Sequence, residues 1–286
     1  MARNDILRFA LLLTIPTLVV VGGLIVFPMV HLVYLSFHTP APAGKGIVFA
    51  GLTNYVALLK AGSFWTSCWV TLQFTFLTTM IPFGIGLLVA VMLNSVERGV
   101  LAYRIIFILP MAVAPVVTGL TWRMMLNPMY GVINYLLGFV GIGPVEWLTN
   151  SRLVIFTVSV VHSWIWMPYV MILLYAGLQM LPSDVYEAAV IDGAGTWNKF
   201  WHVTLPLLQG PIVIAILIKL ILGFRGFDIP YTVTGGGPGE ATTNLVLYAY
   251  LQGFYFFKLE YAAAVGVVML LIAIAFSRQI LKVMPR

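Results

Sequence analysis

The sequence predicts an all-α integral membrane protein, because its composition and the form of its apolar runs agree. Of the 286 residues, 61% are hydrophobic and only 8% are charged, whereas a typical soluble domain has about 25% charged residues. This charge is too sparse to cover a water-facing surface, which excludes a soluble enzyme. The apolar runs are long and unbroken rather than alternating, so they favour helices over a closed barrel.

Six apolar segments are long enough to cross a bilayer, which takes about 20 residues of helix. The first begins after Arg8 and is longer than the apolar core of a signal peptide, so we expect a retained span, with a kink at Pro28. We expect residues 1–286 to form a single transmembrane domain. Its six predicted spans are 9–37, 68–94, 105–122, 153–177, 205–224 and 261–280.

The distribution of positive charge predicts the orientation of these spans. An even number of spans places both termini on one side, together with Arg3, Arg8, Arg98, Arg104, Lys199, Arg278, Lys282 and Arg286. The opposite side then holds Lys45, Lys60, Arg123, Arg152, Arg225 and Lys258. Because the first set lies in shorter loops and is denser, we expect both termini to be cytoplasmic.

The same charges bear on location and partners. They flank the spans, and we therefore expect a multi-pass protein of a bacterial cytoplasmic (inner) membrane, surrounded by membrane lipid. The sequence has no basic run or aromatic-basic stripe, so it does not indicate nucleic-acid binding.

The loop over residues 179–204 predicts a cytoplasmic helix-turn-helix. Asp184 and Glu187 have the spacing of a capping box, Gly193 ends the first helix, and Thr196 begins a second. The small-residue face of the first helix is suited to docking on a partner protein. An amphipathic hairpin lying on the membrane surface fits the same pattern equally well.

This loop also carries a family resemblance. The segment 187–195, with sequence EAAVIDGAG, is followed by Leu205-Pro206 and resembles the EAA loop of ABC importer permeases of the carbohydrate-uptake branch. The segments 109–122, 127–134 and 227–242 resemble that branch in the same order along the chain. The stretch Thr234-Gly-Gly-Gly-Pro238 resembles the first permease of maltose-type importers.

The resemblance implies the type I permease fold and a division of labour among subunits. It implies a homologous second permease, two copies of a cytoplasmic ABC ATPase, an extracytoplasmic solute-binding protein and a small-molecule solute that is moved by alternating access. This chain would then be a permease rather than an enzyme, with no cofactor of its own, because the ATPases bind ATP and Mg. The sequence agrees, since it lacks the G-x4-G-K-[ST] phosphate loop. The coupling residues implied by the EAA motif are Glu187, Ala188, Ala189, Asp192 and Gly193.

Two side chains inside the spans are candidates for solute binding. Lys219 is the one formal charge well inside a predicted span, and a charge in hydrocarbon is costly enough to suggest a function. The alternative is that its long side chain reaches the membrane surface. His162 lies in the fourth span with Trp166 on the same helix face, although a histidine that simply packs is the alternative reading.

The resemblance extends this pocket. Counted from the EAA motif, the maltose-type pocket positions fall on His162, Ile165, Trp166, Lys219, Leu222, Gly223, Gly226, Met111 and Pro115. Most residue types differ from those of the maltose permease, so the resemblance does not imply maltose. A lysine and a histidine facing one pocket suit an anionic solute such as a sugar acid, a sulfonated sugar or a glycerol phosphate ester.

Two other classes of protein compete with this interpretation. A secondary solute transporter needs no ATPase, but such proteins often couple to ions through acidic residues, and the six predicted spans contain none. An intramembrane enzyme could use Ser159 and His162, which are three residues apart, but no nucleophile or metal motif surrounds them.

Overall fold

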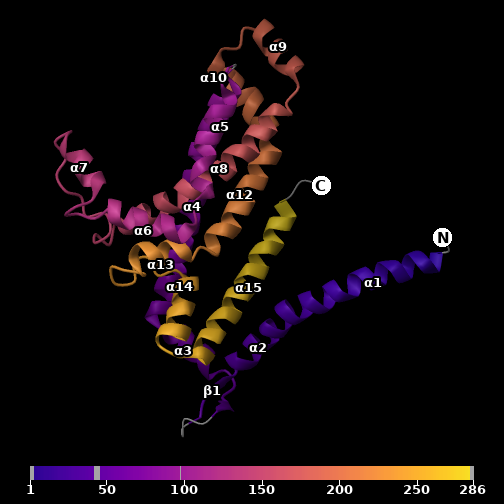
Figure 1. The fold of residues 1–286 in the computed structure, drawn as a ribbon, viewed down its shortest axis with the longest axis vertical. Helices are drawn as coiled ribbons and strands as arrows, with labels where there is room; N and C mark the ends of the chain where they lie inside the picture. Colours follow the sequence, from indigo (N-terminus) through magenta and orange to yellow (C-terminus); the bar gives the residue numbers. More distant parts are fainter. Residues whose placement is uncertain (1–2, 42–45, 97, 284–286) are drawn as a thin grey trace. The chain divides into compact units, whose positions relative to one another are not determined.

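The computed structural model describes residues 3–41, 46–96 and 98–283, so that Lys45 and Arg286 lie outside it. The described chain is mostly helical, with one two-stranded hairpin (Figure 1). It divides into two compact units. One holds the chain up to Phe64 together with Tyr248–Ser277, and the other holds Trp65–Leu247 and the residues that follow Ser277.

The first predicted span forms a helix in three parts. It consists of α1 (Arg3–Val21), the π-helical turn η1 (Gly22–Val26) and α2 (Phe27–Ser36). The π-helical turn comes just before Pro28, whose nitrogen has no hydrogen to donate to the preceding turn. In its most apolar 18-residue window no residue is buried. This helix therefore leaves its apolar surface to lipid or to another chain.

The rest of the first unit is anchored by polar contacts at the end of α2. Strand β1 (His38–Pro40) pairs antiparallel with β2 (Ile47–Phe49) and is followed by α3 (Thr53–Lys60). The Asn54 side-chain amide donates to the carbonyl oxygens of Ser36 and His38, at 3.0 and 2.7 Å. These bonds attach α3 to the end of α2 and the start of β1. The unit also contains η4 (Leu251–Tyr255) and most of α15 (Leu259–Val283).

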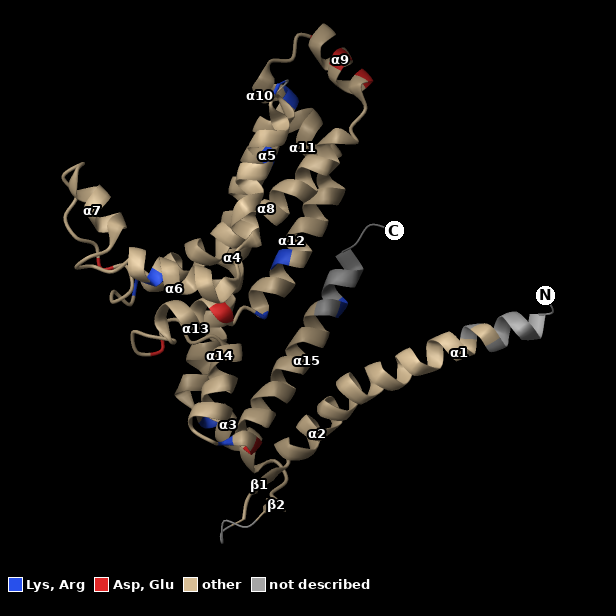
Figure 2. Ribbon diagram, in the orientation of Figure 1, with Lys and Arg blue, Asp and Glu red and all other residues tan. Residues whose placement is uncertain are grey.

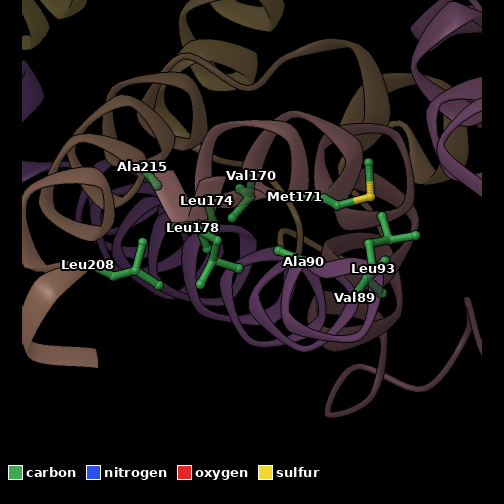
Figure 3. Close-up of a cluster of buried hydrophobic side chains, with 9 residues drawn as sticks. All are labelled: Val89, Ala90, Leu93, Val170, Met171, Leu174, Leu178, Leu208 and Ala215. Carbon is green, nitrogen blue, oxygen red and sulfur yellow. The ribbon is translucent and has the colours of Figure 1, made fainter. Parts of the chain in front are cut away.

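The second unit is built on four helices that run alongside one another. They are α4 (Gly62–Asn94), α5 (Val100–Ile108), α8 (Val154–Gln179) and α12 (Gln209–Phe224). Charged residues are sparse along them (Figure 2). Helices α4, α8 and α12 pack through a buried apolar cluster that also includes Leu208, the residue before α12 (Figure 3). The cluster comprises Val89, Ala90, Leu93, Val170, Met171, Leu174, Leu178, Leu208 and Ala215.

The third predicted span is not one straight helix. Helix α5 continues into the 3-10 turn η2 (Leu109–Ala112), and α6 (Pro115–Met125) then departs at 93°. The reason is Pro115, which lacks an N–H donor and whose ring would clash with the carbonyl of Met111 in a continuous helix. The apolar run predicted a span over residues 105–122 but did not predict this break.

The fifth predicted span is broken in the same way. Helices α10 (Thr196–Lys199), η3 (Phe200–Thr204) and α11 (Leu205–Leu207) lead to α12 across a 68° bend at Leu208. Pro211 prevents a continuous helix, because its ring would meet the carbonyl of Leu207. Four helices of the described chain are long and apolar enough to cross a membrane, or up to six if each bent pair counts as one span.

Two segments predicted as loops contain short helices, namely α7 (Val132–Gly138), α13 (Asp228–Thr234) and α14 (Leu245–Tyr250). Helix α13 packs against α6. At this contact a Cβ added to Gly119 would lie 1.8 Å from the Thr232 hydroxyl oxygen, so only glycine fits there. These segments lie between predicted spans, and the contact between α13 and α6 joins residues more than 100 positions apart in the chain.

We expect Gly119→Ala to destabilise the protein by about 1–3 kcal/mol, because the added methyl overpacks the α6–α13 contact. The thermal unfolding midpoint of the purified protein, followed by tryptophan fluorescence, measures this. The matched control is Gly138→Ala, since a Cβ at Gly138 meets no atom within 4 Å. Equal midpoints for the two variants would contradict the close contact.

Candidate functional site

Lys219 lies inside the second unit without a polar partner. Its side chain, on α12, is 0% exposed, and its ammonium Nζ has no hydrogen-bond partner in the described part of the chain. Nζ lies 5.3 Å from the centre of the Trp166 ring on α8, within the range of a cation–π interaction. The alternative in which Lys219 extends to the membrane surface is therefore wrong.

His162 completes an aromatic cluster around this lysine. Its ring stacks on Trp166, with centroids 6.2 Å apart, and meets the edge of Phe74 from α4 at 5.3 Å. The imidazole is 4% exposed, and its Nδ1 has no partner among the described residues. The Ser159 hydroxyl donates instead to the Ile155 carbonyl at 2.7 Å. The hydroxyl is thus bonded within its own helix, which gives no support to a serine-histidine pair.

The remaining predicted pocket positions have different environments. Ile165 is 3% exposed and belongs to a buried apolar cluster with Phe74. Leu222 is half-buried on α12. Met111 is exposed and Pro115 is half-buried, both at the break between α5 and α6. The structure thus brings together Lys219, Trp166 and His162 but does not place all nine positions in one cluster.

Gly223 and Gly226 have a packing role next to this cluster. A Cβ at Gly223 would lie 2.7 Å from the Thr78 hydroxyl oxygen, and one at Gly226 would lie 2.6 Å from the Phe74 ring. Gly223 on α12 and Gly226 just beyond its end therefore allow a close approach to α4, and Lys219 lies one turn before Gly223. Phe74 was not predicted, because nothing in the sequence distinguishes it from the other apolar residues of α4.

The cluster has a defined chemical capability. A buried ammonium without a counter-charge is unfavourable, so the site gains free energy when an anionic group enters it. The half-buried Trp166 ring contacts both His162 and Lys219 and supplies the aromatic surface of this cluster.

The helix-turn-helix predicted for residues 179–204 is present. Helix α9 (Ser183–Ile191) ends at Gly193, which has φ +76°, a conformation that glycine adopts without strain. The Ala194 N–H donates to the Ala189 carbonyl and the Gly193 N–H to the Val190 carbonyl, which is the Schellman pattern. The predicted capping box is wrong, because Pro182 is the N-cap and makes no side-chain bond.

Helix α9 is displayed at the end of the helix bundle (Figure 1). None of its residues is buried, and Ile191 is 86% exposed. Glu187, Ala188 and Asp192 are exposed, and Ala189 is half-buried. The Tyr186 hydroxyl of α9 is hydrogen-bonded to the Thr204 hydroxyl of η3, with the two oxygens 3.0 Å apart. The helix thus presents apolar and small residues that the rest of the described chain does not cover.

These features define a multi-pass membrane protein with a buried cationic-aromatic cluster and an exposed helix-turn-helix. Comparison with known proteins identifies the family. The family model for the inner membrane component of binding-protein-dependent transport systems matches residues 82–286, and the chain belongs to this family. It is therefore a transport permease of an inner membrane.

Similar proteins are found among permeases and among solved structures. The trehalose/maltose permease MalF of Thermococcus litoralis is 37% identical, with 85% of this chain and 82% of the relative covered. The sulfoquinovosyl glycerol permease SmoG of Agrobacterium fabrum is 32% identical, with 96% and 89% covered. A bacterial transporter for the acidic polysaccharide alginate has the same fold, with TM-score 0.82, 24% identity, and 99% of this chain and 98% of that chain covered. The predicted all-α permease fold is confirmed.

We expect Gly223→Ala to destabilise the protein by about 1–3 kcal/mol through its contact with Thr78. Thr78→Ala removes the hydroxyl that the added methyl meets. The double variant should therefore recover part of the loss, and thermal unfolding of the two single variants and the double variant measures this coupling. Strict additivity would show that Gly223 is not limited by Thr78.

Proposed function

We propose that this chain is a permease subunit of an ATP-driven, binding-protein-dependent importer for an anionic sugar or sugar derivative. The observation that carries the proposal is the buried, unpaired Lys219 ammonium beside the Trp166 ring. The lysine supplies the charge that an acidic substituent needs, and the indole supplies a face for the sugar ring. The solute crosses by alternating access between the two sides of the membrane.

The relatives support a sugar-like solute and allow an anionic one. SmoG of Agrobacterium fabrum is named for sulfoquinovosyl glycerol, and UgpA of the same organism, 34% identical with 96% of this chain and 93% of the relative covered, is named for sn-glycerol 3-phosphate. These two solutes carry a sulfonate and a phosphate. The trehalose/maltose relative is named for neutral disaccharides. Lys219 favours the anionic alternative for this chain.

The partners follow from the family and from the exposed helix α9. We infer a homologous second permease, two ATPase subunits that bind ATP and Mg, and an extracytoplasmic binding protein that delivers the solute. This chain then needs no cofactor of its own. With both termini cytoplasmic, α9 faces the ATPases, and Glu187, Ala188, Ala189 and Asp192 form the contact while Gly193 shapes its end.

The connectivity of the second unit supplies a route from ATPase to solute. Helix α9 leads through α10 and α11 to the bend at Leu208, and α12 carries Lys219 beyond it. Movement of α9 on closure of the ATPases therefore pulls directly on the helix that holds the solute site. A secondary solute transporter is the alternative, and it requires no such linkage.

Lys219→Ala tests the solute class. We expect uptake of an anionic analogue to fall by at least about 30-fold, since removing one partner of a buried charge pair costs about 2–5 kcal/mol. Uptake by native-host cells is compared for sulfoquinovose against glucose, and for sn-glycerol 3-phosphate against glycerol. Lys60→Ala, which removes an exposed lysine of α3, is the control. Equal losses for charged and neutral solutes would contradict an anionic substrate.

Co-purification from native-host membranes tests the importer assignment. We expect a complex with one sister permease and two ATPases, whose ATP hydrolysis is stimulated by the liganded binding protein. Gly193→Ala should reduce this stimulation, because alanine at positive φ costs about 1 kcal/mol or more, and Gly193→Asn should retain most of it. A chain that purifies alone and transports without ATP would favour the secondary transporter.

A further inference from the structure

A cavity of about 490 Å³ lies in the part of the second unit nearer to α9, and no residue of the Lys219 cluster lines it. Arg104 and Ile108 of α5 line one side, and Tyr175, Ala176 and Gln179 of α8 line the other. We refer to it as the Arg104 cavity. Its volume is comparable with that of a small-ligand site.

The chemistry of this cavity is cationic. The Arg104 guanidinium donates a hydrogen bond from Nη2 to the Tyr175 hydroxyl, and its carbon lies 4.1 Å from the centre of the Tyr175 ring. Its Nε is buried without a hydrogen-bond partner among the described residues. The residues lining the cavity include no carboxylate. A guanidinium has five N–H donors and stays charged, so most of its capacity for an anion is unused.

The position of the cavity relates it to the Lys219 cluster. Arg104, Ile108 and Met111 are spaced by four and three residues, so they follow one face of the helical segment that ends at the predicted pocket position Met111. On α8, Tyr175 lies nine residues beyond Trp166, which is about 13 Å along the helix. The Tyr175 side of the cavity therefore lies nearer the α9 end of α8 than Trp166 does, and it lies on another face of that helix.

We propose that the Arg104 cavity is a second binding site for the anionic group of the solute, occupied on the cytoplasmic half of the transport route after Lys219. This inference rests on the proposed function for the orientation and for the charge of the solute. Arg104 binds the anionic group, and Tyr175 holds the guanidinium plane in place. Gln179 donates to the Asn94 side-chain oxygen at 2.6 Å and links α8 to α4 at the rim.

An anionic phospholipid headgroup has the same recognition chemistry as a solute anion. The experiment therefore has to separate the two sources. The single cysteine of the chain, Cys68, makes a site-specific probe simple. In a Cys68→Ala background, Ala176→Cys places one thiol in the Arg104 cavity of the purified full importer complex.

The measurement is the ratio of labelling rates with a sulfonate-bearing and a trimethylammonium-bearing methanethiosulfonate reagent. We expect this ratio to be about tenfold higher with Arg104 than with Arg104→Gln, since a full charge within the cavity acts at short range. Arg104→Lys, which keeps the charge without the planar fork, should give an intermediate ratio. An unchanged ratio in Arg104→Gln would overturn the proposal.

Inorganic sulfate and the lipid composition distinguish the occupants. We expect sulfate to slow labelling by the sulfonate reagent equally in vesicles of phosphatidylcholine and of phosphatidylcholine with phosphatidylglycerol. Protection that appears with phosphatidylglycerol and is insensitive to sulfate would overturn the solute site in favour of a lipid site. The sulfate experiment uses the Ala176→Cys chain with Arg104 intact, so its outcome does not depend on the folding of Arg104→Gln.

The outcome is separable from that of the proposed function. Lys219→Ala should leave the labelling ratio at Ala176→Cys unchanged, because the two sites are on different helix pairs. If uptake proves indifferent to Lys219 while the ratio depends on Arg104, the anionic-solute function fails and the Arg104 anion site stands. If uptake depends on Lys219 and the ratio ignores Arg104, the second site alone is overturned.

Discussion

The hydrocarbon core of a membrane offers no hydrogen-bond partner, and the architecture of this chain follows from that constraint. Backbone N–H and C=O groups are satisfied inside helices, so the long apolar runs form helices. At Pro115 and Pro211 one helix has ended and the next starts at a steep angle, whereas Pro16, Pro82 and Pro168 lie inside continuous helices. The break at Leu208 is buried within the second unit, whereas the residues at the break before Pro115 are exposed. The same constraint makes each charge in the helices costly.

Lys219 is the exception that this constraint makes informative. Its ammonium is buried among aromatic rings without a polar partner, which a stable protein tolerates where binding restores the lost interaction. The close approach of α12 to α4 at Gly223 and Gly226 holds the lysine in this environment. The site and the packing that supports it therefore come from the same short helical segment, and that segment is continuous with the exposed loop at the end of the bundle.

This continuity suggests why the helix breaks are useful. A straight helix from Thr196 to Phe224 would transmit movement along its axis only. In the proposed mechanism, the 68° bend at Leu208 converts displacement of α9 into rotation of α12, which carries Lys219. The Schellman motif at Gly193 ends α9, and none of the residues of α9 is buried. The helix proposed to contact the ATPases and the helix proposed to bind the solute are thus linked directly along the chain.

The sequence by itself determined the features that depend on composition and local spacing. Apolar length predicted the membrane helices, Gly193 predicted the end of α9, and the motif order predicted the family that the comparisons then identified. The four-residue spacing of His162 and Trp166 also placed them on one face of a predicted helix. Tertiary structure decided the rest, because it depends on contacts between residues far apart in the chain. No local sequence pattern predicts the contacts of Phe74 with His162, Gly119 with Thr232 and Tyr175 with Arg104. The burial of Lys219 has no local sequence signal either. Periodicity reports which face of a helix is apolar, whereas only packing decides which other helix covers it.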